Sequence, residues 1–346
     1  ISILPIKNLL KRKRKGVSIT QNPQFQQLTD HEAEVLRKIR QETHDKNLDN
    51  ISRTRAYLDF YLDYPEMIWS FLASMVSRNG GYNMCDLEGE WFPKFLDPPI
   101  RQRLFLTYER ANWLIFRDAY SQLLLYSYST KKSSPMFHLL KFLDVSSFME
   151  REWQMFWEHG DKKRLLTALI INEQNVIHNP VIKHPVYKKR VFNTLMFSFE
   201  DYLHFSTVLF PTCEGELYGA SVNGFKSVSK RINLGKRLAS ILFDNRYYPL
   251  FLEFAMHTEH TASRHDYEQY FPSNKKRDTP FLRSTYPIIQ HHFHEQGDWY
   301  KERGYHKKWF SQELNHRHPA HLTGWYKKKQ KQLHALISLK ELFTPE

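Results

Sequence analysis

The sequence predicts a mainly α protein built around one large multi-helix domain. Only 12 of its 346 residues are glycine, and apolar residues recur at helical spacing over long segments. Glycine-rich phosphate-binding α/β folds show neither property, so helix-on-helix packing is favoured. A hydrophobic content of 41% is enough for a sizeable core. We expect a helical core domain over residues 28–272, a basic flexible tail over residues 1–27, and a basic, His- and aromatic-rich extension, irregular plus helical, over residues 273–346.

The first two helices are indicated by their N-terminal residues and their spacing. Thr29 followed by Glu32 has the residue types of a capping box, which predicts that a helix begins beside Thr29. A second helix is expected over about residues 50–62. Its apolar side chains share one side, and Arg53 and Arg55 are expected to lie off that side.

Two strongly apolar segments within residues 65–126 are expected to form the centre of the domain. Pro65 suits a first helical position, and Gly80 is expected to end that helix. Residues 82–96 are expected to form an irregular connection. A pair of prolines then opens a long helix over about residues 98–128.

Further helices are predicted from apolar periodicity and turn residues. Ser147 and Glu150 resemble a second capping box. A long aromatic-rich helix is expected to end at Phe210, because Pro211 follows it, and a glycine-containing loop is expected next. The expected ranges are 135–143, 146–158, 161–177, 186–210, 225–243, 246–258 and 325–342.

The net charge of +13 is concentrated at the two ends of the sequence. Residues 1–27 carry six basic residues and no acid, and residues 273–346 carry fourteen Lys and Arg against seven acids. The segment between them is balanced. This distribution indicates peripheral contact with an anionic partner, either nucleic acid, a membrane surface or an acidic protein. The residues expected to make this contact are Lys11, Arg12, Lys13, Arg14, Lys15, Lys327, Lys328 and Lys329.

Cysteine usage and hydropathy bear on the cellular compartment. Cys85 and Cys213 lack a CxxC partner, which argues against a disulfide framework and a cysteine zinc site and fits a reducing compartment. No apolar run reaches the roughly 18 residues needed to span a bilayer. We therefore expect a cytoplasmic protein, with peripheral contact at the membrane surface as an option through its basic ends.

Four separated motifs resemble a bacterial protein family. They are MVSRNGGYNMCDLEGEW, ERANWLIFRDAYSQLLLY, LYGASVNGF with RINLGKRLASILF, and HTASRHDY, in this order. Together they resemble the Bacillus-type family known as domain of unknown function 2515, and the resemblance covers roughly residues 30–330. It implies a soluble protein of endospore-forming-type bacteria. It implies no activity and transfers no functional residues, because the family is uncharacterised.

Several polar residues interrupt the apolar central segments. Buried polar groups are unfavourable unless they are paired, so one interpretation is a buried network that fixes the register of the helices. Arg117 and Asp118 project differently from one helix and need separate partners. The alternative is an arginine-lined pocket for a small anion, because a planar guanidinium matches phosphate or carboxylate. The candidate anion-binding residues are Arg78, Arg110, Arg117 and Arg264.

Two pairs of residues at helical spacing are candidates for acid–base or metal chemistry. Glu200 and His204 are four residues apart, and His257 and His260 are three apart. A helical bundle could bring these groups together around a divalent metal ion or as an acid–base pair. Carboxylate–histidine pairs that satisfy one another explain the same pattern, so no cofactor is assigned.

Two functional hypotheses follow from these patterns. The first is a non-enzymatic binding or scaffold protein whose basic ends contact an anionic partner. The second is an enzyme or small-anion binder with an Arg- and His-lined pocket in the helical core, including a metal-dependent hydrolase. The two differ in whether the candidate arginines and histidines converge on one cavity.

Overall fold

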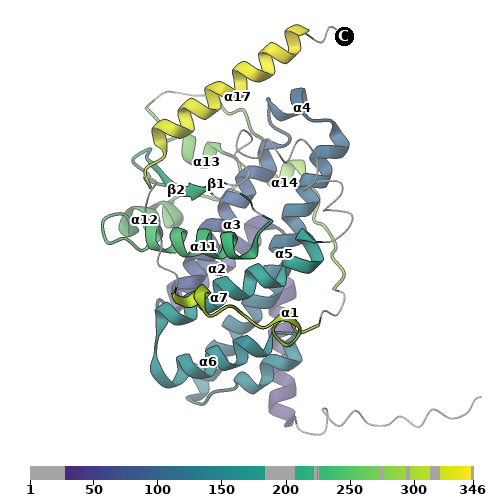
Figure 1. Ribbon diagram of the computed structural model, residues 1–346, viewed down its shortest axis with the longest axis vertical. Helices are drawn as coiled ribbons and strands as arrows, with labels where there is room; N and C mark the ends of the chain where they lie inside the picture. Colours follow the sequence, from purple (N-terminus) through teal and green to yellow (C-terminus); the bar gives the residue numbers. More distant parts are fainter. Residues whose placement is uncertain are drawn as a thin grey trace, which may run out of the picture.

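The computed structural model describes residues 28–183, 207–221, 224, 226–272, 276–293, 297–311 and 320–343. The basic tail expected over residues 1–27, and most of the helix expected over residues 186–210, lie outside the described residues. Within them the protein is mainly α, as predicted, and a two-stranded sheet lies against the helical body (Figure 1).

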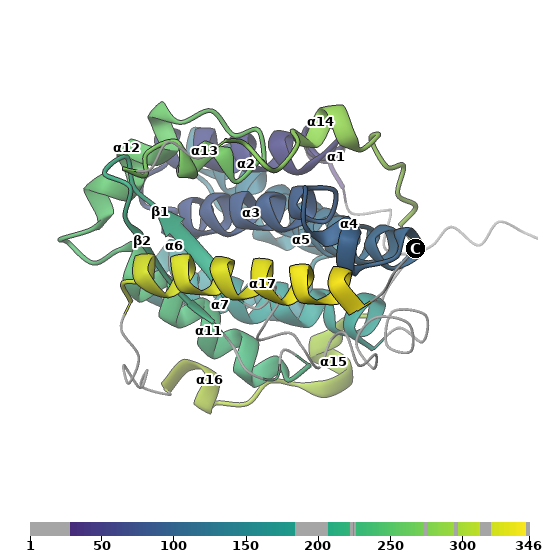
Figure 2. The same cartoon turned by 90° about the horizontal axis from the view of Figure 1, so that it is seen from above.

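The helices before residue 184 build most of the body, and the C-terminal elements lie across it (Figure 2). Before residue 184 the structure contains α1 (Asp30–Lys46), α2 (Asn50–Asp63), α3 (Ile68–Asp86), α4 (Phe92–Phe95), α5 (Pro98–Lys132), a 3-10 helix (Phe137–Leu143), α6 (Ser147–His159), α7 (Lys162–Val176) and a π-helical turn (His178–Ile182). After residue 206 come β1 (Thr207–Pro211), β2 (Leu217–Ser221), α11 (Val228–Leu242), α12 (Tyr248–His257), α13 (His265–Glu268), α14 (Leu282–Thr285), α15 (Trp299–Arg303), α16 (Lys308–Ser311) and α17 (Thr323–Phe343).

The start signals of α1 and α5 are confirmed. The Thr29 hydroxyl accepts the Glu32 N–H at 3.2 Å, and the Glu32 carboxylate accepts the Thr29 N–H at 2.9 Å. This reciprocal pair satisfies two N–H groups that a helix N-terminus leaves unpaired. Pro98 and Pro99 occupy the first turn of α5, where a missing N–H has no cost.

The second predicted capping box is wrong. Ser146 precedes α6 as its N-cap, and Ser147 is the first helical residue. The Ser147 N–H and hydroxyl both donate to one oxygen of Asp298, at 3.1 and 2.6 Å. A carboxylate 151 residues away therefore takes the place of the local capping partner, which no short sequence window can indicate.

The prediction that Gly80 ends its helix is also wrong, because α3 continues to Asp86 through the centre of the body. A side-chain carbon on the next residue, Gly81, would lie 2.4 Å from Asn50 Oδ1 and 2.8 Å from the Ala262 side chain. Gly81 is therefore needed for close packing of neighbouring segments against α3. The expected irregular connection begins only after Asp86.

Residues 207–211 form a strand, which corrects the prediction of a helix ending at Phe210. The strand β1 pairs antiparallel with β2, which replaces part of the expected loop. Asn79 of α3 explains the position of β1: its side chain donates to Thr207 O at 3.2 Å and accepts the Leu209 N–H at 3.0 Å. An amide on the central helix thus supplies hydrogen bonds that a neighbouring strand would otherwise make.

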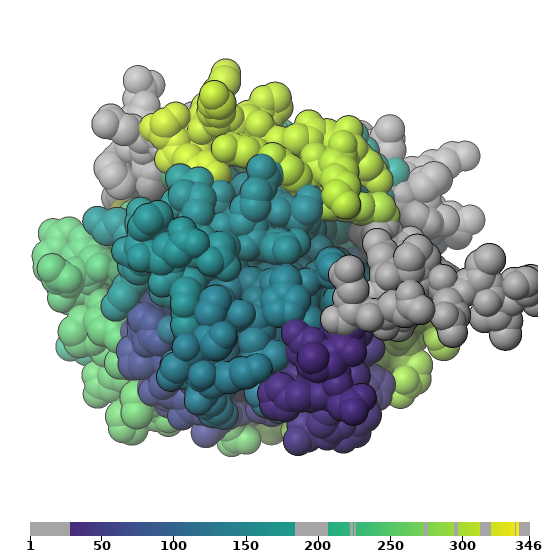
Figure 3. Space-filling model, turned by 90° about the horizontal axis from the view of Figure 1, so that it is seen from below, coloured from purple at the N-terminus to yellow at the C-terminus, as the bar shows by residue number. Residues whose placement is uncertain are grey.

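The C-terminal elements lie across the body. Seen from above, α17 crosses the top, with α13 and α14 on one side and α15 and α16 on the other (Figure 2). The segment leading into α17 is bonded to β2, where Gly219 N–H donates to Ala320 O at 2.8 Å and Leu322 N–H to Leu217 O at 2.7 Å. Residues 297–311 cover part of α6 and α7 (Figure 3). In the described part of the chain, no helix has both the length and the apolar character needed to cross a bilayer.

Candidate functional site

The four candidate arginines do not share one cavity. Arg78 donates to the backbone carbonyls of Ala255 and Thr258, at 3.3 and 3.0 Å, at the end of α12. Carbonyl groups at a helix C-terminus carry partial negative charge. Arg78 therefore stabilises the end of α12 and joins it to α3.

Two arginines of α5 lie against aromatic rings. Arg117 pairs with Asp144 at 2.5 Å, and its guanidinium carbon lies 3.3 Å from the ring centre of Phe293. The guanidinium carbon of Arg110 lies 4.9 Å from the ring centre of Trp113. Arg117 borders a cavity of about 320 Å³, and Arg110 does not border that cavity.

Arg264 lies in a buried cluster of opposite charge. It contacts the carboxylates of Asp86, Glu268 at 2.7 Å and Asp278 at 2.9 Å, and donates to the Tyr326 hydroxyl at 3.1 Å. Burial opposes the charge of Arg264, but Asp86 and the other acids raise its pKa well above the ordinary value. Burial raises the pKa of Asp86 to about 6 despite that contact. The cluster joins α3, α13 and α17.

A second buried ion pair joins α2 to α5. Arg53 is 1% exposed, and its Nη2 donates to Glu109 at 2.5 Å. The prediction that Arg53 lies off the buried side of its helix is therefore wrong, because a carboxylate on another helix compensates its charge. Burial opposes ionisation of Glu109, but Arg53 holds its pKa below the ordinary range. His291 Nε2 lies 3.5 Å from the other Glu109 oxygen.

The two described candidate histidines have different surroundings. His257 is exposed, with Nδ1 3.0 Å from the backbone oxygen of Glu253. His260 is buried, with Nε2 2.8 Å from Asn50 Oδ1 and Nδ1 3.3 Å from Asp266 Oδ2. Burial lowers the pKa of His260 to about 4. His260 thus joins α2 to the segment before α13.

The metal hypothesis has no support from the part of the chain that the structure describes. Within that part, no three or more His, Cys, Asp or Glu side chains are grouped so that they could hold a metal ion. Glu200 and His204 lie outside the described residues.

A cavity of about 180 Å³ lies between helices of the body and β1, with mostly apolar walls. Small or branched residues at helical spacing line one face of α3 and one face of α5. Their side chains are too short to fill the space between the helices, and the cavity results. The apolar wall includes Leu72, Ala73, Val76, Gly80, Ala111, Ile115, Ile177, Val208, Leu234, Gly235 and Leu238.

Glu173 and Arg231 are two of the ionisable groups that border this central cavity. Glu173 of α7 accepts a hydrogen bond from Gln174 at 3.0 Å, and burial raises its pKa to about 7. Arg231 of α11 is 2% exposed and donates to the Gln174 side chain at 2.8 Å. Burial lowers the pKa of Arg231 to about 10. Apolar surroundings therefore weaken the ionisation of both groups.

Three buried donors of residues along this cavity have no hydrogen-bond partner among the described residues. They are Arg53 Nε, Tyr57 Oη and Asn112 Nδ2. Burial raises the pKa of Tyr57 well above its ordinary value, so its hydroxyl keeps its proton. A buried donor without a partner costs roughly 1–3 kcal/mol, so few occur in native proteins. All three atoms also have almost no accessible surface, so they lie behind the cavity wall and do not open into the cavity.

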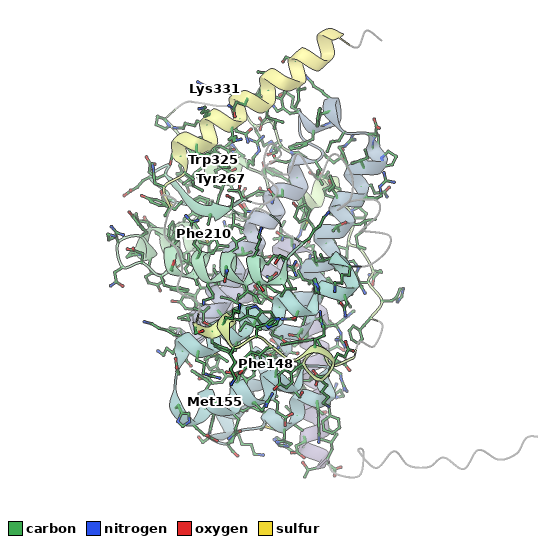
Figure 4. All side chains as sticks on the ribbon, in the orientation of Figure 1. Phe148, Met155, Phe210, Tyr267, Trp325 and Lys331 are labelled. Atoms are coloured by element: carbon green, nitrogen blue, oxygen red, sulfur yellow. The ribbon has the colours of Figure 1, made fainter. Side chains whose placement is uncertain are left out.

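The described lysine candidates lie on α17. Lys327 and Lys328 are exposed, Lys329 is half-buried, and exposed Lys331 follows on the same helix (Figure 4). The Lys327 ammonium lies 5.0 Å from the ring centre of Phe271. The lysine and arginine candidates of the N-terminal tail lie outside the described residues.

The fold and these sites define a mainly α protein whose centre combines paired charges with an apolar cavity. The chain belongs to the family described as "Protein of unknown function (DUF2515)", whose sequence model matches residues 45–327. It is similar to "Uncharacterized protein YppC" of Bacillus subtilis (strain 168), with 45% identity over 308 residues, which cover 89% of this chain and 95% of that protein. No solved structure gives a significant match. The resemblance carried by the four motifs is therefore confirmed.

The sequence candidates omitted the polar residues of the central cavity. Glu173 stands in a strongly apolar helix beside Asn172, which is the same signal that drew attention to α5. Applied to α7, it would have identified Glu173. Asn112 is one of the polar residues that interrupt the apolar segment of α5, so it carries this signal, whereas Tyr57 does not, because its isolation from partners depends on how the helices pack.

Proposed function

We propose that this protein binds a small, largely apolar molecule that bears an acceptor oxygen, a carbonyl or a carboxylate, in the central cavity. The observation that supports this proposal is the largely apolar cavity wall that includes the buried Arg231 and the raised-pKa carboxyl group of Glu173, both of which can donate a hydrogen bond. An apolar cavity of about 150 Å³ accepts a benzene-sized molecule. A volume of about 180 Å³ therefore suits an aromatic ring or a short aliphatic body with one polar group.

The charges around the cavity favour an acceptor on the ligand. Arg231 supplies positive potential at the cavity wall, whereas the charge of Arg53 is already compensated by Glu109. With a pKa of about 7, the Glu173 carboxyl is partly protonated at neutral pH and is then a donor rather than a competing anion. The proposal takes up the small-anion hypothesis with Arg231 in place of the arginines expected from the sequence.

Filling the central cavity is expected to abolish this binding. Acetophenone and benzoate, measured by isothermal titration calorimetry, are expected to bind the unaltered protein. In an Ala111→Phe variant the new ring occupies the cavity, so affinity for both probes is expected to fall at least about tenfold. Folding stability is expected to change little, because the ring fills existing space.

The control is the same substitution at an exposed position, Ala335→Phe on α17, which is expected to leave binding unchanged. Toluene matches the apolar body without an acceptor and is expected to bind more weakly than acetophenone. Equal acetophenone affinity in the unaltered protein and in Ala111→Phe would refute the proposal, as would absence of binding by both acceptor-bearing probes.

A second, non-enzymatic function is favoured by the exposed lysines of α17. We propose that Lys327, Lys328 and Lys331 contact an anionic partner, for which nucleic acid is the first probe and anionic vesicles are the second. The three side chains lie within about one helical turn, so one phosphate-bearing surface can meet all of them.

Reversing these three charges is expected to weaken binding and its salt dependence together. For Lys327→Glu, Lys328→Glu and Lys331→Glu combined, the slope of log affinity against log salt is expected to fall by about 2 to 3 between roughly 50 and 200 mM salt. Fluorescence anisotropy with single-stranded DNA measures this. The same charge reversal at exposed Lys131, Lys132 and Lys162 is the control. An equal loss in both triple variants would leave only a net-charge effect and would contradict a binding surface on α17.

A further inference from the structure

A second and larger cavity, of about 320 Å³, borders other faces of α5 and α7. The central cavity is lined by Ala111 and Ile115 of α5, whereas this one is lined by Leu114 and Asp118. On α7 the central cavity is lined by Glu173, whereas this second cavity is lined by Asn175 and Val176. The remaining wall includes residues of the 297–303 segment and, from the link between the 3-10 helix and α6, Asp144 and Ser146.

Asp118 gives this second cavity one buried carboxyl group. Its residue is 6% exposed, and both of its described donors reach the same oxygen. Gln122 Nε2 donates to Oδ1 at 2.7 Å, and Asn172 Nδ2 donates to Oδ1 at 2.5 Å. No described group donates to Oδ2. Because Oδ2 is also not one of the fully enclosed atoms without a partner, it retains accessible surface. The second carboxyl oxygen therefore reaches the cavity.

The two amides that hold Asp118 are themselves fixed. The Trp153 indole N–H donates to Gln122 Oε1 at 2.8 Å, which directs the Gln122 NH₂ group at Asp118. Ser146 Oγ and the Trp299 indole N–H both donate to Asn172 Oδ1 at 2.9 Å, which orients the Asn172 NH₂ group in the same way. The carboxyl is therefore preorganised by a shell of oriented groups, as in a built binding site.

The other charged groups around this cavity already have partners or lie at its edge. Arg117 is paired with Asp144, and Asp298 accepts from Ser147 and from the N-terminus of α15. The apolar wall includes Leu114, Val176, Pro180, Phe293 and Trp299. A ligand in this cavity would contact an apolar and aromatic wall and one available carboxyl oxygen, that of Asp118.

We propose that Asp118 anchors a second binding site, which takes a molecule with a protonated amine or amidinium group on an apolar or aromatic body. A cation is favoured because Asp118 Oδ2 is an acceptor, and because the described residues of the wall include four acids and two arginines. A metal ion is disfavoured, because the described residues provide no group of three or more metal-ligating side chains. The size of the cavity suits an organic cation.

The site is expected to respond to pH through Asp118. Burial raises the pKa of Asp118 to about 7, and a bound cation favours the ionised form. Affinity for the cation therefore rises with pH, by about tenfold between about pH 6 and pH 8, as the ionised fraction grows from about a tenth to about nine-tenths. The charged groups that face Asp118 from its own and neighbouring elements are Arg117, Asp144, Asp298, Glu302 and Arg303.

The test uses benzylamine and its uncharged analogue, benzyl alcohol, titrated calorimetrically into the full chain at about pH 8. In Asp118→Asn the side-chain oxygen still accepts from Gln122 and Asn172, so the fold is expected to persist. Benzylamine affinity is expected to fall at least about tenfold, while benzyl alcohol binding is unchanged. Asp45→Asn makes the same change at an exposed carboxylate and is expected to have no effect.

A second variant keeps the proposal testable if Asp118→Asn is poorly folded. Val176→Phe fills the cavity from its apolar wall and is expected to exclude benzylamine without altering Asp118. Equal benzylamine affinity in the unaltered protein and in both variants would overturn the proposal. So would equal binding of benzyl alcohol and benzylamine, or an affinity that does not change between about pH 6 and pH 8. Acetophenone binding reports separately on the central cavity, so failure of one proposal leaves the other distinguishable.

Discussion

Replacing Arg264 with alanine is expected to destabilise the protein by about 3–5 kcal/mol. Arg264 is 4% exposed and its guanidinium lies against three carboxylates, so its removal leaves Asp86, Glu268 and Asp278 buried without their counter-charge. Tyr326 would also lose a hydrogen-bonding partner. Loss of one member of a buried charge cluster is among the few single changes with so large an effect.

Urea unfolding at several pH values measures this effect and tests its cause. Without Arg264 the native state is expected to bind protons more readily than the unfolded chain, because the acids remain buried. Stability then rises as pH falls, and the deficit should shrink between about pH 8 and pH 5. The pKa of Asp86 is already raised to about 6 in the intact cluster. Arg55→Ala, at an exposed ion pair with Asp59, is the control and should change stability by less than about 0.5 kcal/mol. A deficit as small as that control would show that the buried acids do not depend on Arg264.

Breaking the Arg53–Glu109 pair from either side is expected to cost a similar amount, about 3–5 kcal/mol. Glu109→Leu leaves the guanidinium of Arg53, a residue that is 1% exposed, without its carboxylate, and Arg53→Met leaves the carboxylate of Glu109, which is 3% exposed, without its guanidinium. The double variant removes both charges and replaces them with apolar groups of similar size. Its loss is expected to be much smaller than the sum of the single losses.

A double-mutant cycle by urea unfolding measures the coupling between the two positions. We expect a coupling of about 2–3 kcal/mol, because each single variant contains an uncompensated buried charge and the double variant contains none. Strict additivity would contradict this, and would mean that each side chain acts mainly through other neighbours. His291 is one such neighbour of Glu109.

Local patterns predicted much of the helical framework. The capping box at Thr29 and Glu32 and the proline pair before α5 act within a few residues, so the sequence alone contains both partners. The periodicity of α5 and α7 likewise reports burial on one face. These signals predicted the fold class and most helices of the first half of the chain.

Long-range partners explain what the sequence did not predict. Arg53 has the charge of a surface residue, and its burial depends on Glu109, 56 residues away on another helix. The strand β1 depends on an amide of α3 that is more than a hundred residues earlier in the chain. The sequence predicted that Asp118 needs partners of its own. It could not predict that Gln122 and Asn172 both donate to Oδ1, which leaves Oδ2 directed into a cavity.

The bonds between β2 and the segment that enters α17 have a consequence for the order of folding. Leu217 and Gly219 of β2 bond to residues near position 320, and Arg264 needs Tyr326 to complete its surroundings. During synthesis these partners leave the ribosome about a hundred and about sixty residues later, respectively. We infer that the charge cluster around Arg264 lacks the Tyr326 hydroxyl, and β2 lacks its partners near position 320, until this part of the chain emerges. Contacts so distant in sequence slow folding, so closure of α17 over the body is expected to be a late and slow step.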